Sequence, residues 1–93
     1  MKTIEIIQKE QIKDLKFCKK EVLSDETAIR RRNFDLMRAQ ALGNLLKSKV
    51  SITFETADEK FYQVTTTVWA VGTDFICLKS DIHIPINSIR EVD

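Results

Sequence analysis

The sequence predicts an α+β fold, in which an N-terminal helical segment packs on a small five-stranded, strongly bent antiparallel barrel. Apolar residues recur at helical spacing in the first half, whereas from Lys49 onward they alternate with polar residues as in strands. Short apolar runs separated by turn residues are typical of small β-structures. We expect one domain over residues 1–93, with the helical segment at 1–47 and the barrel at 48–93.

Most of the first half is expected to be helical. Residues 9–23 are rich in Lys, Glu, Gln and Leu, which favour helices. Ser24 then precedes two acidic residues and suits an N-cap, but the same residues also fit inside a longer helix. One helix and two helices over residues 9–46 are therefore both open. Residues 26–42 form the stronger helical stretch, and its apolar stripe should pack on the barrel. The members of this stripe are Phe34, Met37, Ala41 and Leu45.

The second half is expected to form the strands of the barrel. Their bounds are residues 50–55, 61–71, 75–79, 82–86 and 90–92. The second run is rich in Thr and Val, whose β-branching favours strands, and it is long enough to bend around the barrel. The alternating phase of the runs predicts one buried core. Its members are Val50, Ile52, Val68, Ile76, Leu78, Ile86 and Ile89.

Four short motifs follow one another from the end of the helical segment to the C-terminus. They are Leu42-Gly43-Asn44-Leu45-Leu46, Val50-Ser51-Ile52, Ile76-Cys77-Leu78-Lys79 and Ile86-Asn87-Ser88-Ile89. With the bent second strand, they resemble the Sm-like small barrels, which include the bacterial Hfq RNA chaperones, over residues 34–93. An SH3-like barrel has nearly the same pattern. The resemblance implies ring assembly and RNA binding, but the Lys-His pair of Hfq falls on His83 and Ile84, so that RNA-binding motif is not reproduced.

The sequence offers no pattern that identifies an enzyme. Cys18 and Cys77 are far apart and His83 is the only histidine, so no cluster of metal ligands is predicted. There is no nucleophile–base pair and no Gly-rich phosphate loop. We therefore predict no catalytic residue, no cofactor and no metal. Because a secretory signal and a bilayer-length apolar run are both lacking, we expect a cytoplasmic protein with no membrane partner.

Positive charge is concentrated in the first half of the chain. Residues 1–48 carry 11 Lys/Arg and 7 Asp/Glu, a net charge of +4, whereas residues 49–93 carry 4 Lys/Arg and 7 Asp/Glu, a net charge of −3. The candidates for contact with nucleic acid or with a protein partner are Arg30, Arg31, Arg32, Arg38 and Trp69. A solvated helix face is the simpler interpretation of the arginines. The strand segment around Trp69 is apolar on both faces, which predicts cover by the helix or by another subunit.

These observations predict a non-enzymatic small-barrel binding or interaction module that acts through protein–protein contacts or oligomerisation. Its partner would be another copy of the chain or a different protein. The alternative is an Sm-like protein that binds RNA or single-stranded nucleic acid. This alternative is supported by the basic helix and by the fold resemblance, which alone does not define a function.

Overall fold

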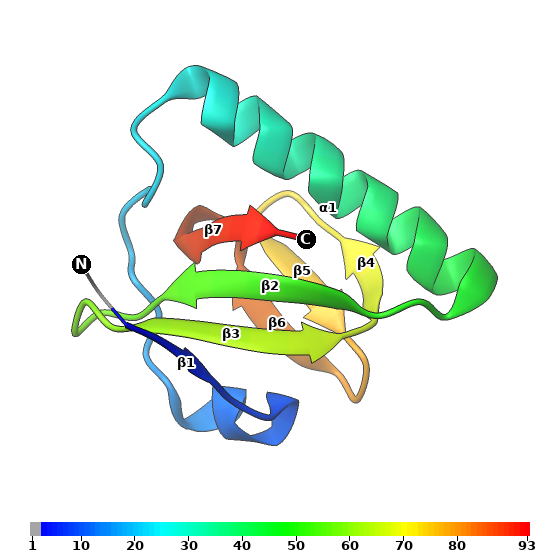
Figure 1. Cartoon of the computed structure of the whole chain (residues 1–93), viewed down its shortest axis with the longest axis horizontal. Coiled ribbons are helices and arrows are strands. Elements are labelled where there is room, and N and C mark those ends of the chain that lie inside the picture. Colours follow the sequence, from blue (N-terminus) through cyan, green and yellow to red (C-terminus); the bar gives the residue numbers. More distant parts are fainter. Residues whose placement is uncertain (1–2) are drawn as a thin grey trace.

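The computed structural model describes residues 3–93 and contains one α-helix and seven strands. In chain order the elements are β1 (Ile4–Ile6), the 3-10 helix η1 (Lys9–Asp14), α1 (Glu26–Leu46), β2 (Val50–Glu55), β3 (Phe61–Thr66), β4 (Val68–Val71), β5 (Phe75–Leu78), β6 (Ile82–Pro85), the 3-10 helix η2 (Ile86–Ser88) and β7 (Ile89–Val92). The strands form two open sheets, with the orders β1-β3-β2-β7 and β4-β5-β6. Helix α1 lies along one side of the sheets, and β1 and η1 lie on the other side (Figure 1).

The two sheets do not close into the five-stranded Sm-like or SH3-like barrel expected from the sequence, so that prediction is wrong. The expected long strand over residues 61–71 is interrupted at Thr67. Before Thr67, β3 pairs with β2, and after it β4 pairs with β5, so the chain passes from one sheet to the other. Within residues 3–93, no strand of one sheet pairs with a strand of the other. Apolar alternation defines which side chains face inward, but it does not define which strands become neighbours.

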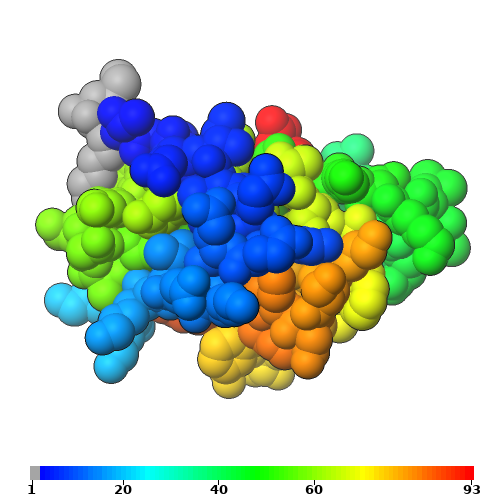
Figure 2. All heavy atoms as spheres, turned by 90° about the horizontal axis from the view of Figure 1, so that it is seen from below, coloured from blue at the N-terminus to red at the C-terminus, as the bar shows by residue number. Residues whose placement is uncertain are grey.

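The N-terminal segment, residues 3–22, does not contain the helix expected over residues 9–23. Instead, β1 runs parallel to β3, η1 follows, and the rest is irregular apart from an isolated bridge at Phe17. The side-chain amide of Asn87 holds this irregular part by donating to the Cys18 carbonyl at 2.9 Å. Ile12 is fully buried in the core, and this tertiary contact overrides the local preference for helix. Figure 2 shows the N-terminal segment spread over the side of the molecule away from α1.

Residues 9–46 therefore contain one α-helix, which begins after the N-cap Asp25 and ends before Lys47. The Asp25 carboxylate accepts a hydrogen bond from the Thr27 N–H, and Lys47 adopts a left-handed conformation that ends the helix. The buried side of α1 consists of Arg32, Leu36, Ala39 and Gly43. No helix in the described part of the chain is both long enough and apolar enough to cross a bilayer.

Helix α1 approaches β4 closely because Gly43 has no side chain. A Cβ atom at Gly43 would lie 2.5 Å from the Val68 carbonyl oxygen. One turn earlier, the side-chain carbonyl of Gln40 accepts a hydrogen bond from the Val71 N–H on the edge strand β4. Helix α1 thereby covers a strand edge that could otherwise pair with another chain.

The core lies between the sheets, and α1 and η1 each contribute to it. Most of the predicted core residues are buried, namely Ile52, Val68, Ile76, Leu78 and Ile89, whereas Val50 and Ile86 are half-buried. Ile12 from η1 and Leu36 from α1 are also fully buried. Phe54 is the largest fully buried side chain, and its ring centroid lies 5.4 Å from that of Phe17. The strand phase was thus predicted better than the strand pairing.

Candidate functional site

Arg32 lies where three parts of the chain meet, and it is not available to bind an anionic ligand. Its side chain is only 4% exposed. Its two Nη atoms donate to the Glu21 carboxylate at 2.6 and 2.7 Å, and Nη1 also donates to the Ile89 carbonyl at 3.0 Å. Its Nε atom has no acceptor among residues 3–93. Arg32 is therefore buried, whereas the other candidate contact residues are exposed.

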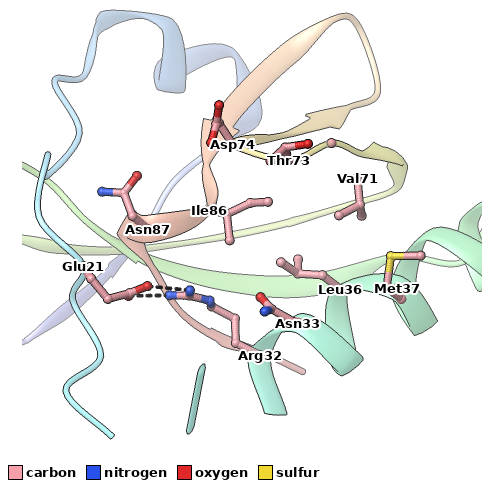
Figure 3. A pocket seen from close by; sticks show the side chains of 11 residues that line it. Glu21, Arg32, Asn33, Leu36, Met37, Val71, Thr73, Asp74, Ile86 and Asn87 are labelled. Carbon is pink, nitrogen blue, oxygen red and sulfur yellow. Dashed lines mark hydrogen bonds and ion pairs between the residues drawn. The ribbon is translucent and has the colours of Figure 1, made fainter. Parts of the chain in front are cut away.

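A hollow of about 410 Å³ lies beside this ion pair. Glu21 and Arg32 lie at one end of the hollow, and Met37 and Val71 lie at the other end (Figure 3). Hydrogen bonds from Arg32 lower the pKa of the Glu21 carboxyl group. Arg32 is the only cation among the described lining residues, and Glu21 already neutralises it, while Asp74 adds a further acid. The hollow is therefore not suited to a phosphate group.

The other three candidate arginines lie on the exposed part of α1. Arg30 pairs with Glu26, and Arg31 pairs with Asp35, both at 3.3 Å. Exposed pairs four residues apart on a helix contribute only about 0.3–0.5 kcal/mol each. Arg38 has no ion-pair partner in the described part of the chain. It is therefore the arginine of α1 that forms no ion pair within residues 3–93, although it shares a hollow with Asp35 and Asp93.

The apolar stripe of α1 faces outward, so the prediction that it packs on a barrel is wrong. Phe34 is 66% exposed, Met37 is 53% exposed and Leu45 is 80% exposed. Residues three or four apart share one side of a helix, so these residues and Ala41 form one surface, which we call the outer face of α1. The opposite side packs inward, and Gly43 on that side allows a close approach to β4.

Trp69 lies on β4 beside the C-terminal end of α1. The residue is 48% exposed, so α1 does not cover it fully, and cover by another subunit stays a prediction. Trp69 shares a hollow of about 460 Å³ with three lysines, Lys47, Lys49 and Lys79. None of these lysines has an ion-pair partner within residues 3–93. An aromatic ring among uncompensated cations is an arrangement that single-strand-binding proteins use.

Cys77, Asp81 and His83 form a cluster that was not predicted from the sequence. Cys77 and His83 are directly opposite each other in the hairpin of β5 and β6. Asp81 lies in the connecting turn, and its Oδ1 is 3.9 Å from the Cys77 Sγ and 3.9 Å from the His83 Nε2. Burial, together with the Asp81 carboxylate, raises the pKa of the Cys77 thiol. The sequence does contain one signal for this cluster. Cys77 and His83 lie at equal distances along the chain from Ser80, as residues that face each other across a hairpin do.

Comparisons of the chain with protein families, with curated proteins and with solved structures found no match. Three features of the structure remain as candidates for a function. They are the outer face of α1, the hollow around Trp69 and the Cys77–Asp81–His83 cluster.

Proposed function

We propose that the protein is a non-enzymatic interaction module of the cytoplasm and that the outer face of α1 binds a protein partner. The observation that carries this proposal is the exposure of Phe34, Met37 and Leu45 on one side of a single helix. Large contiguous apolar patches are rare on monomeric proteins and usually mark a binding site. Both cysteines are free, which supports a reducing compartment such as the cytoplasm.

The proposed partner is an amphipathic segment that has an apolar stripe and acidic flanks. Arg38 follows Phe34 by one turn of α1, so its charge lies beside the outer face. Lys47 extends the positive charge beyond the C-terminal end of the helix. The acids of α1, Glu26 and Asp35, are both paired with arginines and do not oppose an acidic partner. Complementary charge at the rim of an apolar contact selects such a partner.

A second copy of the chain is a poorer occupant of this face. Two copies of α1 packed antiparallel through Phe34 and Leu45 would be centred between residues 39 and 40. The two Arg38 side chains would then lie within about one helical turn of each other, or about 5 Å along the axis. Parallel packing would place them side by side. Both arrangements bring like charges together and disfavour association.

Two helical peptides, each about 18 residues long and hence about 27 Å in length, test this proposal. One peptide has leucine at every third or fourth position with glutamates on both flanks, and the other has lysines in place of the glutamates. Fluorescence anisotropy should show micromolar affinity for the glutamate peptide. Affinity for the lysine peptide should be at least about 10-fold weaker, a difference of about 1.4 kcal/mol. Emission from Trp69, the only tryptophan, reports whether the peptide extends over β4.

Leu45 and Leu46 provide a matched pair of variants for the same experiment. These residues are 80% and 69% exposed, but only Leu45 belongs to the outer face. Leu45→Ser should weaken binding of the glutamate peptide by at least about 10-fold, as expected for an anchor residue, whereas Leu46→Ser should have little effect. Equal effects of the two variants would contradict the proposal. A dimer in sedimentation that Leu45→Ser dissociates would identify a second copy as the occupant and would also contradict it.

Binding of single-stranded nucleic acid is a second candidate function, and the hollow around Trp69 favours it. The indole ring would stack on a base, while Lys47, Lys49 and Lys79 would contact phosphates. Three phosphate contacts to a single strand predict that log K falls with log salt with a slope of about −2. Anisotropy with labelled uridine-rich and adenine-rich oligonucleotides measures this slope. Lys49→Glu should abolish such binding, and undetectable binding by the unmodified chain at physiological salt would eliminate this candidate.

A further inference from the structure

We propose that Cys77, Asp81 and His83 form a binding site for a divalent transition-metal ion, with zinc as the preferred ion. One ligand atom from each residue, a sulfur, a carboxylate oxygen and an imidazole nitrogen, lies within 4.8 Å of the other two. This site lies on the β5–β6 hairpin and does not depend on the function proposed for α1.

The backbone of the hairpin places the three side chains together. Cys77 and His83 are paired across β5 and β6, and directly opposite residues of an antiparallel pair project from the same face. Because Leu78 pairs with Ile82, the loop consists of Lys79, Ser80 and Asp81, and Ser80 and Asp81 both have positive φ angles, 72° and 61°. Asp tolerates this left-handed conformation better than most residues. The turn thereby brings the Asp81 carboxylate back toward the two paired strand residues.

The distances fit a tetrahedral ion after a small adjustment of the side chains. Zinc binds sulfur at about 2.3 Å and nitrogen or oxygen at about 2.0 Å, so neighbouring ligand atoms should lie about 3.3–3.5 Å apart. Asp81 Oδ1 lies 3.9 Å from both the Cys77 and the His83 ligand atoms. The Asp81 and His83 side chains are 87% and 52% exposed, which leaves them room to close on an ion beside the more buried Cys77. A water molecule would occupy the fourth position.

The types of ligand indicate which ions the site should bind. Thiolate and imidazole suit zinc and related transition metals, whereas magnesium and calcium require oxygen ligands. Cobalt titration of the full, reduced chain should produce the near-ultraviolet thiolate-to-cobalt absorption and the intense visible bands of a tetrahedral site. Zinc should displace cobalt at one ion per chain, and magnesium and calcium should not. The absence of saturable zinc binding, or displacement by calcium, would overturn the proposal.

Substitutions of each ligand and one matched control identify the site. Cys77→Ser, Asp81→Asn and His83→Ala should each weaken zinc binding by more than about 10-fold, since even loss of an outer partner of a metal ligand has an effect of that size. Cys18→Ser, at the other free cysteine, should leave the affinity unchanged. His83 is exposed, so His83→Ala should retain the circular dichroism spectrum of the fold. Equal losses in Cys18→Ser and Cys77→Ser, or unchanged binding in His83→Ala, would contradict the assignment.

Discussion

Arg32 connects three parts of the chain through one side chain. Its backbone belongs to α1, and its guanidinium binds the Glu21 carboxylate of the N-terminal segment and the Ile89 carbonyl of β7. Breaking a buried ion pair by removing one partner typically lowers stability by about 3–5 kcal/mol. Because the Glu21 side chain is 35% exposed, solvent should reduce the loss when Glu21 is the partner removed.

The Glu21–Arg32 pair should make stability depend on pH in the acidic range. The pKa of Glu21 is lowered from 4.5, above all by the hydrogen bond from Arg32. A carboxylate with a lowered folded-state pKa stabilises the fold above its unfolded-state pKa, and this contribution is lost as the pH falls through the folded-state value. The urea midpoint should therefore decrease as the pH falls below about 4.5. In Glu21→Gln this acid-side decrease should be shallower.

Urea titrations between about pH 7 and pH 3 measure this effect. Glu10→Gln, which replaces an exposed carboxylate in η1, is the matched control and should follow the unmodified chain. If Glu21→Gln and Glu10→Gln have the same pH profile, the Glu21–Arg32 pair does not contribute to the acid sensitivity of the fold.

At the scale of elements, the N-terminal segment is bound to the sheets by both backbone and side chains. Strand β1 is hydrogen-bonded to β3, and the Ile7 N–H donates to the Gln63 carbonyl at 2.9 Å. Further along, Phe17 forms a bridge with Thr56 of the loop after β2. Ile12 of η1 is the most deeply buried residue of the segment. The segment should therefore unfold together with the sheets.

Two isoleucines of the N-terminal segment test whether it belongs to the same cooperative unit. Ile12 is 1% exposed, so Ile12→Ala should lower the free energy of unfolding by about 2–5 kcal/mol. Ile6 is 75% exposed, so Ile6→Ala should change it by no more than about 0.5 kcal/mol. Urea unfolding followed by circular dichroism measures both changes. Equal midpoints for the two variants would show that the segment unfolds separately from the sheets.

Elements that are specified by their own residues were predictable from the sequence. The helical spacing over residues 26–42 lies within α1, and apolar alternation located β2, β5 and β6. The structure of residues 9–23 was not predictable, because the burial of Ile12 against distant strands outweighs the local helix preference. The open sheets were not predictable either, because the break at Thr67 depends on long-range strand pairing.

In the candidate site, too, features set by local residues were predictable and features set by long-range contacts were not. Trp69 is exposed and its role as a contact residue stays a prediction, whereas the arginines could not be ranked from the sequence. Arg32 lies next to Arg31 in the chain, yet it is buried because it faces Glu21 across the fold. The proximity of Cys77 and His83 became visible only when β5 and β6 were paired. Long-range partners, and not residue types, decide which charged groups are free.

At the scale of the whole molecule, the sheets are covered by the N-terminal segment on one side and by α1 on the other side. The N-terminal segment spreads over the side away from α1, whereas the outer face of α1 remains uncovered (Figures 1 and 2). Arg38, Lys47 and Lys49, which have no ion-pair partners in the described residues, lie on or just after this helix. Exposed apolar side chains beside unpaired positive charge are the basis for an acidic, amphipathic partner.

Reversal of the Arg38 charge tests most directly whether the outer face of α1 selects such a partner. The unmodified chain should bind the glutamate peptide at least about 10-fold more tightly than the lysine peptide, and Arg38→Glu should reverse that preference. Lys60→Glu changes the net charge equally, but Lys60 lies in the hairpin between β2 and β3, so this variant should keep the original preference. An unchanged preference in Arg38→Glu, or the same reversal in Lys60→Glu, would contradict the account.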